Sequence, residues 1–223
     1  MKVNGFVPAK VNGIVPSKVN GLAFSGSSFA YLTGATSNHA SGANGSSTGS
    51  FDSTGAGLII VAVAYFTGGS FSSISDNAGN TYTPLSLYSG DADPGVRIYY
   101  ALAPSTRVSH TVTVSGGSIY CGFEVACFSG GSAFESESGA SAVRPGSLTP
   151  SVNGCLLVCM AGAKTSSGQP TSIDSGFTVS TNSASGAGES YGSGLAYLIQ
   201  ATAAAVNPAW DASNNTAMAV FKP

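Results

Sequence analysis

Serines within the pattern G-x-S-x-G are the first residues whose spacing could support chemistry. The pattern occurs at Gly45–Gly49 and at Gly188–Gly192. In a nucleophile elbow, the serine lies between a strand and a helix, and its histidine partner follows later in the chain. The two histidines, His39 and His110, both precede the second pattern, and no helix is expected after the first. We therefore interpret both matches as products of a Ser/Gly-rich sequence.

Paired acidic residues could act together in glycoside hydrolysis, which uses two carboxylates about 5 to 9.5 Å apart. The candidates are Asp91 with Asp93 and Glu135 with Glu137. Both pairs lie in segments rich in Gly, Ser or Pro, where acidic residues form turns and keep the surface soluble. We predict that the chain is not an enzyme, and a polysaccharide depolymerase is the least favoured alternative.

Cysteines and clustered oxygen ligands are the candidates for metal binding. The four cysteines form two pairs, Cys121 with Cys127 and Cys155 with Cys159. Their spacings differ from those of structural zinc sites, so buried free thiols are favoured over a bridge between the pairs, although the redox state stays open. The segment Asp76–Asn80 could offer oxygens to Ca²⁺, but it lacks EF-hand spacing and an Asx turn is favoured. We expect no metal and no cofactor.

Glu124 is unusual because it lies within an apolar run, between Phe123 and Val125. If those two neighbours face the core, Glu124 faces outward, because side chains alternate along a strand. There it would either meet Arg97 or Arg107 or be solvated.

Aromatic side chains could form a surface on which sugars stack, because their rings combine apolar faces with polar edges. The candidate glycan contacts are Tyr88, Tyr191 and Trp210, with Asp91 and Asp93. The favoured interpretation for most of the aromatic residues is a place in the core or in an interface.

The composition decides which elements must position these residues. Of 223 residues, 30 are Gly and 8% are charged, against about a quarter charged in typical domains. So few charged residues cannot supply the polar faces of several amphipathic helices, whereas 43% hydrophobic residues are enough for a core. We predict an all-β fold, an antiparallel two-sheet β-sandwich, jelly-roll or Ig-like, of about ten strands with an extended N-terminal arm. The expected strands are Gly57–Phe66, Thr81–Leu87, Val96–Leu102, His110–Val114, Ile119–Phe128, Gly154–Ala163, Gly176–Val179, Leu195–Gln200, Val206–Trp210 and Thr216–Phe221.

Charge and apolar runs limit the partners. The net charge of −2 argues against a nucleic-acid binder. The longest strongly apolar run, Leu58–Phe66, is about half as long as a membrane-spanning helix, so no membrane insertion is expected. Because this run is apolar on both faces, we expect a central strand or an outer face covered by a subunit or the arm. The N-terminus has no continuous apolar stretch, so we expect no signal peptide and synthesis in the host cytoplasm.

The N-terminus is a repeat of three octapeptides, residues 2–9, 10–17 and 18–25, each beginning Lys-Val-Asn-Gly. Asn-Gly favours a turn, and an isolated extended unit cannot bury its apolar side chain by itself. We interpret residues 1–25 as an arm that docks on a partner, with a flexible linker or an expression leftover as the alternative. Its docking residues would be Lys2, Phe6, Lys10, Ile14, Lys18 and Leu22. Residues 26–56 would be a Ser/Gly-rich connector that could include a first strand, and 57–223 the sandwich body.

A resemblance to a known family follows from the order of these motifs. The succession GLIIVAVAYF, ISDNAGNTYTPL, VRIYYA, HTVTVSGGSIYCGFEVACFSGG, NGCLLVCMAGA, GFTV and AMAVFKP resembles a β-sandwich module of bacteriophage virion proteins and bacterial surface proteins. The KVNG units are similar to segments that precede such modules in phage structural proteins. The resemblance covers residues 2–25 and about 57–223. It implies a virion or cell-surface location and no chemistry.

These observations lead to a functional expectation. We expect a phage virion structural protein, a surface, decoration or appendage component whose arm binds other virion proteins. The alternative is a tail-fibre or adhesin module that binds host surface glycans. Two-sided apolar strands and sparse charge favour a homo-oligomer, with a trimer the expected state. The location on the particle, whether head, tail or baseplate, stays open.

Overall fold

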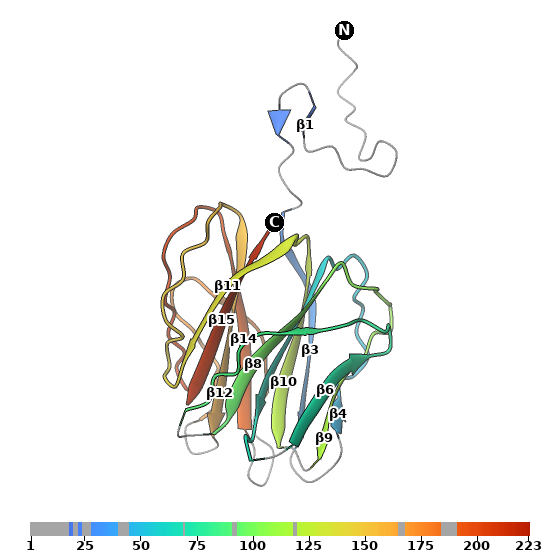
Figure 1. Cartoon of the computed structure of the whole chain (residues 1–223), viewed down its shortest axis with the longest axis vertical. Coiled ribbons are helices and arrows are strands. Elements are labelled where there is room, and N and C mark those ends of the chain that lie inside the picture. Colours follow the sequence, from blue (N-terminus) through green and yellow to red (C-terminus); the bar gives the residue numbers. More distant parts are fainter. Residues whose placement is uncertain are drawn as a thin grey trace.

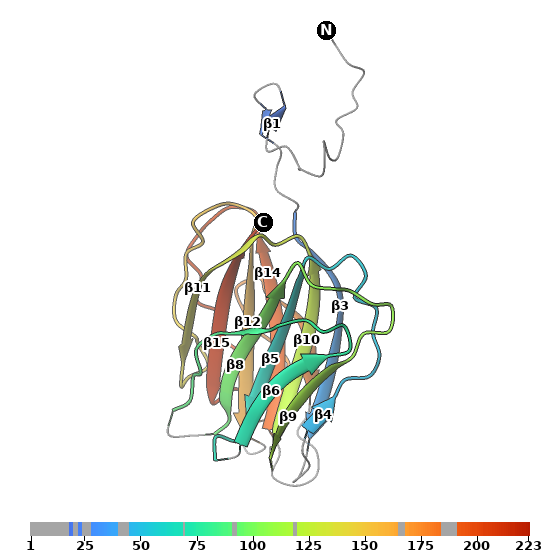
Figure 2. The ribbon, with the colours of Figure 1, turned by 45° about the vertical axis from the view of Figure 1, so that its right-hand side comes forward.

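The computed structural model describes residues 18–19, 22–23, 28–39, 45–68, 70–90, 93–117, 120–164, 168–183 and 191–223. All regular elements in these residues are β-strands, stacked in layers (Figures 1 and 2). The same residues contain no helix that is long and apolar enough to cross a membrane. The expected antiparallel β-sandwich is therefore confirmed.

The first sheet has five strands in the order β3-β10-β5-β8-β7. They are β3 (Ala30–His39), β10 (Cys121–Ser129), β5 (Leu58–Tyr65), β8 (Gly95–Leu102) and β7 (Thr83–Pro84). All eight residues of β5 are buried, as expected for a central strand rich in Val, Ile and Ala. β10 and β8 pair with it on its two sides, both antiparallel.

The second sheet also has five strands, in the order β11-β15-β12-β14-β13. They are β11 (Ala133–Ala140), β15 (Asn215–Lys222), β12 (Cys155–Lys164), β14 (Tyr191–Gln200) and β13 (Thr178–Ser183). Here β12 is central, and nine of its ten residues are buried. The inner faces of the two sheets form the main core, in which Leu58, Ile60 and Phe128 pack with Leu156, Val158 and Phe221.

Each sheet also has a covered outer face, which explains why its central strand is apolar on both sides. A three-stranded cover sheet lies over the first sheet, with β4 (Gly45–Ser47), β9 (Val112–Gly117) and β6 (Ser70–Asp76) in the order β4-β9-β6. Over the second sheet, loops supply Phe177, Trp210 and Ile173, which pack on Leu157 and Met218. The chain itself therefore covers both outer faces.

Several strands depart from the expected list. β3, β6 and β11 fall outside every expected run, and β3 and β4 lie within residues 26–56. β11, with the sequence AFESESGA, lacks apolar alternation. As an edge strand it pairs with one neighbour and is partly exposed to solvent, so it does not need a continuous row of apolar side chains. Two expected runs were wrong in extent: residues 206–210 contribute only isolated bridges at Val206 and Trp210, and residues 81–87 contribute only β7.

The two sheets repeat one topology. If the five strands of each sheet are numbered in chain order, both sheets read 1-5-2-4-3. The register agrees with this. Ala62 in the centre of β5 pairs with Glu124 and Ile98, and Met160 in the centre of β12 pairs with Ala217 and Leu195.

The outer covers repeat as well. The first cover contains the pairs Phe51↔His110 and Ile74↔Val114, and the second contains Leu148↔Val206 and Ile173↔Trp210. In each cover the second residues of the two pairs are four positions apart. The body is therefore two similar units, residues 30–129 and 133–222, that face each other.

Equivalent aromatic rings clamp the two units together. Tyr197 of the second unit stacks on Tyr31 at 5.2 Å and meets the edge of Phe128 at 5.3 Å. Tyr100 of the first unit stacks on Phe134 at 5.7 Å and meets the edge of Phe221 at 5.3 Å. Each tyrosine thus inserts into an aromatic pair, and the two clamps are related by the duplication.

The arm lies mostly outside the described residues, including Lys2, Phe6, Lys10 and Ile14. The third octapeptide contributes β1 (Lys18–Val19) and β2 (Leu22–Ala23), which pair antiparallel with each other as a two-stranded sheet of their own. Val19 pairs with Leu22, so the two residues between them are the Asn-Gly of the repeat, the sequence expected at a hairpin turn.

The equivalence of the two clamps predicts equal contributions to stability. Tyr100→Ala and Tyr197→Ala should each lower the free energy of unfolding by about 3 kcal/mol, because each removes a large packed ring. Urea unfolding followed by circular dichroism measures both changes. Thr83→Ala, at an exposed edge position, should change stability by less than about 0.5 kcal/mol. A large loss in only one tyrosine variant would contradict the equivalence.

Candidate functional site

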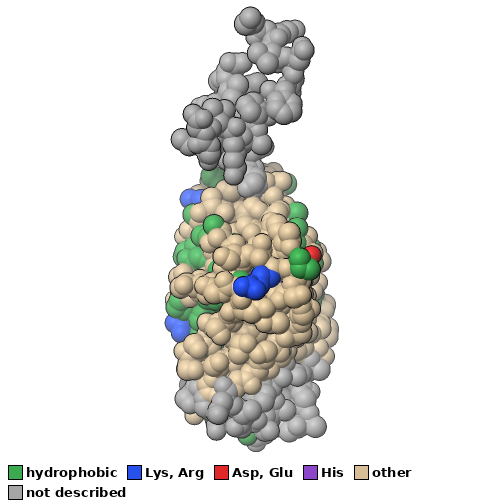
Figure 3. Space-filling model, turned by 90° about the vertical axis from the view of Figure 1, so that its right-hand side faces the viewer, with side chains coloured by type: hydrophobic (Ala, Val, Ile, Leu, Met, Phe, Trp, Pro, Cys, Tyr) green, Lys and Arg blue, Asp and Glu red, His purple; other side chains and the backbone are tan. Residues whose placement is uncertain are grey.

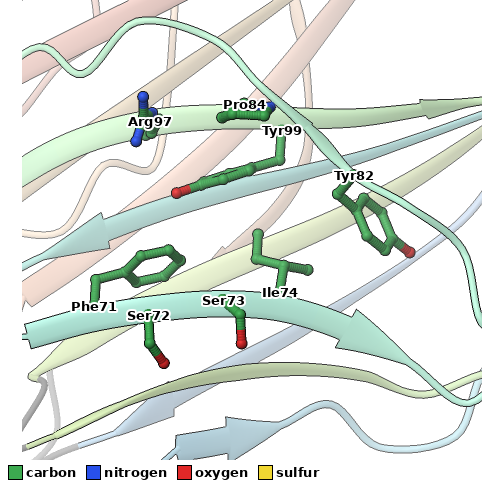
Figure 4. Close-up of a pocket in the computed structure, with 8 residues that line it drawn as sticks. All are labelled: Phe71, Ser72, Ser73, Ile74, Tyr82, Pro84, Arg97 and Tyr99. Atoms are coloured by element: carbon green, nitrogen blue, oxygen red, sulfur yellow. The ribbon is translucent and has the colours of Figure 1, made fainter.

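A groove of about 350 Å³ opens between the cover sheet and the edge of the first sheet (Figure 4). Phe71 and Ile74 line it from β6, the edge strand of the cover sheet. Arg97 and Tyr99 line it from β8, because these alternate residues point to the outer face of the first sheet. Its remaining walls come from Ser72, Ser73, Tyr82 and Pro84.

Arg97 is the charged group of the groove. Its Nε donates a hydrogen bond of 2.6 Å to the carbonyl of Leu85, and its guanidinium carbon lies 5.6 Å from the centre of the Tyr99 ring. Burial raises the pKa of Tyr99, and the neighbouring Arg97 lowers it in part. No carboxylate among the described residues lies within 4 Å of the guanidinium. The Leu85 carbonyl and the Tyr99 ring thus orient the guanidinium. Its charge is not compensated by a carboxylate of the described residues, so it is able to bind an anion.

Tyr82 connects the groove to a buried polar network centred on Asp76. The Tyr82 hydroxyl donates to Asp76 Oδ2 at 2.7 Å, and Asn80 donates to both carboxylate oxygens. Burial raises the pKa of Asp76, but the hydrogen bonds from Asn80, Tyr82 and His110 outweigh burial and lower the pKa to about 2. Asp76 Oδ1 also accepts from the amide of Ala78, so the expected Asx turn is confirmed.

The same network contains a serine, a histidine and an aspartate in contact, the groups of a nucleophilic triad. His110 Nε2 lies 3.0 Å from Asp76 Oδ2, and His110 Nδ1 lies 2.7 Å from Ser53 Oγ. Ser53 and His110 are fully buried, and Ser53 Oγ also bonds the backbone N–H and C=O of Arg107. A nucleophile must reach its substrate, so the geometry fits a cross-link between loops.

No motif in the sequence signals this cross-link. Ser53 lies in the expected connector, 57 residues before His110. The two approach each other only because Phe51 pairs with His110 at the edge of the cover sheet, a contact that residue spacing does not reveal.

Glu124 is not on the surface, which corrects the expectation that it meets Arg97, Arg107 or solvent. It is fully buried between the two sheets. Its Oε1 accepts hydrogen bonds from Thr36 at 3.1 Å and Ser193 at 2.8 Å, whereas Oε2 has no partner among the described residues. Desolvation raises the pKa of Glu124 to about 7, although the nearby hydroxyls lower it in part. The carboxyl therefore changes its ionisation state near neutral pH.

The alternation of β10 was interpreted correctly, but the environment of its second face was not. Phe123 and Val125 do face one side and pack in the core beneath the cover sheet. The opposite side, with Glu124 and Ala126, faces the second sheet. Both faces are buried, so neither side of β10 is available to solvent.

The cysteines are free and buried, as favoured from the sequence. Burial raises the pKa of Cys121, Cys127 and Cys159 to about 12, so these thiols stay protonated and unreactive at neutral pH. Trp210 donates its indole N–H toward Cys159 Sγ at 3.3 Å. No cluster of three or more potential metal ligands occurs within the described ranges.

The structure describes four of the five expected glycan contacts, and two of these four are buried. Trp210 and Tyr191 are buried, at 3% and 7% exposure, which corrects their assignment as surface contacts. Asp93 accepts hydrogen bonds from the backbone and hydroxyl of Thr67, and Tyr88 is half-buried. Asp91 lies outside the described residues. The groove is lined by other residues. The one sequence signal for it is that Arg97 and Tyr99, two positions apart on β8, share a face of the strand.

The acidic pair on β11 has a structural role. Glu137 accepts hydrogen bonds from the amide and hydroxyl of Ser86, and Glu135 accepts one from the amide of Ser151. Each carboxylate therefore ties β11 to a different loop.

Comparisons with known proteins give no relative: no family model matches, and no match is found among curated proteins or solved structures. The resemblance to phage virion proteins thus rests on sequence motifs alone.

The buried Glu124 predicts a pH-dependent stability. Its pKa of about 7 lies above the unfolded value of 4.5, so its contribution is present below pH 4.5 and is lost as pH rises through 7. Glu124→Gln should remove about 2.5 kcal/mol of the stability decrease between pH 5 and 8. Urea unfolding at several pH values measures this. Glu137→Gln, on the partly exposed β11, should keep the decrease, and an unchanged pH profile in the Glu124→Gln variant would contradict the prediction.

The Asp76 network predicts the opposite dependence at acid pH. Its pKa of about 2 lies below the unfolded value, so the stabilisation is present above pH 3.8 and is lost as pH falls through 2. Asp76→Asn should cost about 3 kcal/mol at pH 7, because one amide oxygen cannot replace an ionised buried acceptor. Asp52→Asn is the control, since Asp52 is exposed and its carboxylate accepts from the nearby Thr54 amide, so its loss should be small. An equal loss in both variants would contradict a special role for Asp76.

Proposed function

We propose that this chain is a structural component of a bacteriophage particle, present on the virion surface and docked to other virion proteins through its N-terminal arm. The observation that carries the proposal is the threefold Lys-Val-Asn-Gly repeat with an apolar residue after each Asn-Gly. A repeated short unit offers several equivalent contacts, and linked contacts bind more tightly than one.

The described part of the arm supports this interpretation. β1 and β2 pair with each other, and neither pairs with a strand of the body. An isolated short hairpin is marginally stable in water and gains stability only when it packs against another surface. Phe6, Ile14 and Leu22 occupy the same place in the three units, so one receptor geometry could serve each of them.

The body supports the proposal in a different way. Both of its sheets are covered by the chain itself, so the body does not depend on the arm for its core. The face in Figure 3 consists mainly of uncharged polar side chains and backbone. A net charge of −2 gives little repulsion between neighbouring copies, which favours dense assembly and a homo-oligomer such as a trimer.

Deletion of residues 1–25 should leave a folded body that no longer enters particles. Circular dichroism and thermal unfolding test the fold, and quantification of the protein in purified particles tests docking. Phe6→Ser, Ile14→Ser and Leu22→Ser combined should reduce incorporation at least tenfold, because the apolar contacts are lost. Lys2→Gln, Lys10→Gln and Lys18→Gln combined are the control and should reduce it less. Normal incorporation of the truncated protein would refute the proposal.

A further inference from the structure

The duplication supplies an internal comparison for the groove. Arg97 and Tyr99 of β8 pair with Val63 and Val61 of the central strand, two positions that flank Ala62. The equivalent residues of β14, which flank Leu195 and pair with Ala161 and Cys159, are Gly194 and Ala196. Two large side chains in the first unit thus correspond to two of the smallest in the second.

The second unit closes this position. A Cβ atom added to Gly194 would lie 3.0 Å from Pro170 Cβ and 3.0 Å from the Trp210 ring, so these side chains pack directly on the strand. Trp210 and Ala196 belong to a continuous buried cluster there. The shared topology therefore allows the outer layer to be filled at this position. The groove of the first unit is due to the particular side chains that line it and not to the fold.

We propose that the groove binds an acidic saccharide, with Arg97 pairing with the carboxylate of a uronic or sialic acid. The guanidinium is oriented by the Nε bond to Leu85 and by the Tyr99 ring, while no carboxylate of the described chain neutralises its charge. A planar guanidinium with two parallel N–H donors matches a carboxylate. Binding an anion would supply the counter-ion that Arg97 lacks among these residues.

The rest of the lining fits a sugar ring. Phe71 and Tyr99 lie 5.7 Å apart with their planes inclined by 32°, and Figure 4 shows Ile74 beside them. Such surfaces pack against the C–H face of a pyranose, since aromatic residues combine apolar area with polar edges. The hydroxyl of Tyr82 is held by Asp76, so this residue offers its ring.

The volume limits the ligand. About 350 Å³ is at the lower end of the range for small-molecule sites, which favours one or two sugar units over a long chain. The lining residues all lie between positions 71 and 99, outside residues 1–25, so the two proposals can fail independently.

The test compares digalacturonate with its dimethyl ester, which has the same sugar skeleton but no negative charge. The full-length protein should bind the acid, measured by calorimetry and by NMR shifts confined to the groove, at least tenfold more tightly than the ester. 3′-Sialyllactose beside lactose, and a glucuronate disaccharide beside its methyl ester, extend the comparison to other acids. Arg97→Gln should weaken binding at least tenfold, and Arg97→Lys should fall between, because ammonium lacks the paired donors.

Arg107→Gln is the matched control, because Arg107 is exposed and outside the groove lining. It should bind like the unchanged protein. A thermal melt shows whether Arg97→Gln still folds, and the NMR shifts of the unchanged protein locate binding without any variant. Binding to none of the three acids, equal binding of the neutral partners, shifts outside the groove or tighter binding of a peptide carboxylate would overturn the proposal.

Discussion

The central strands β5 and β12 must be shielded from water on both faces, and most of the architecture depends on this constraint. Every residue of β5 and nine of ten in β12 are buried. One face of each strand is covered by the opposite sheet. The other needs a second layer, because an exposed row of Val, Ile and Leu would cost about 25 cal/mol for each Å² of apolar area. The cover sheet and the loops around Trp210 provide it from the same chain.

The duplication separates what the fold requires from what each unit has added. The inner faces are nearly equivalent, with Tyr100 and Tyr197 inserted into matching aromatic pairs. The outer layers differ more. Where the first unit pairs Phe51 with His110, whose ring bonds Asp76, the second unit has the wholly apolar pair Leu148 and Val206. A hydrogen-bonded network fixes geometry more strictly than apolar packing, because unpaired buried groups are costly. The first unit therefore holds its cover, and the groove beside it, in one arrangement.

The sequence was sufficient for the fold class because low charge and short apolar runs exclude most alternatives. It located β5 and β12, whose apolar character is continuous. It gave β3 only as a possible first strand of the connector and missed β11, and both are edge strands with polar sequences. It also misplaced Glu124. The alternation of side chains along a strand shows which residues share a face. Whether that face contacts solvent depends on how many layers cover the strand, which the alternation does not show. Burial of Trp210 and contact of Ser53 with His110 depend on long-range pairing, which residue spacing does not encode.

The scarcity of charge gives the remaining charged groups diagnostic value. In a chain with 8% charged residues, the described carboxylates of the interior have protein partners suited to them. Asp76 accepts from Asn80, Tyr82 and His110, and Glu124 accepts through Oε1 from Thr36 and Ser193. Arg97 differs, because a carbonyl and an aromatic side chain stabilise a cation only weakly compared with a carboxylate. If the groove were only a packing defect, apolar side chains such as Trp210 and Pro170, which close the equivalent position of the second unit, would fill it without the cost of desolvating a cation. A cation kept half-buried without a counter-ion from the described residues is instead consistent with an anion that arrives from solution.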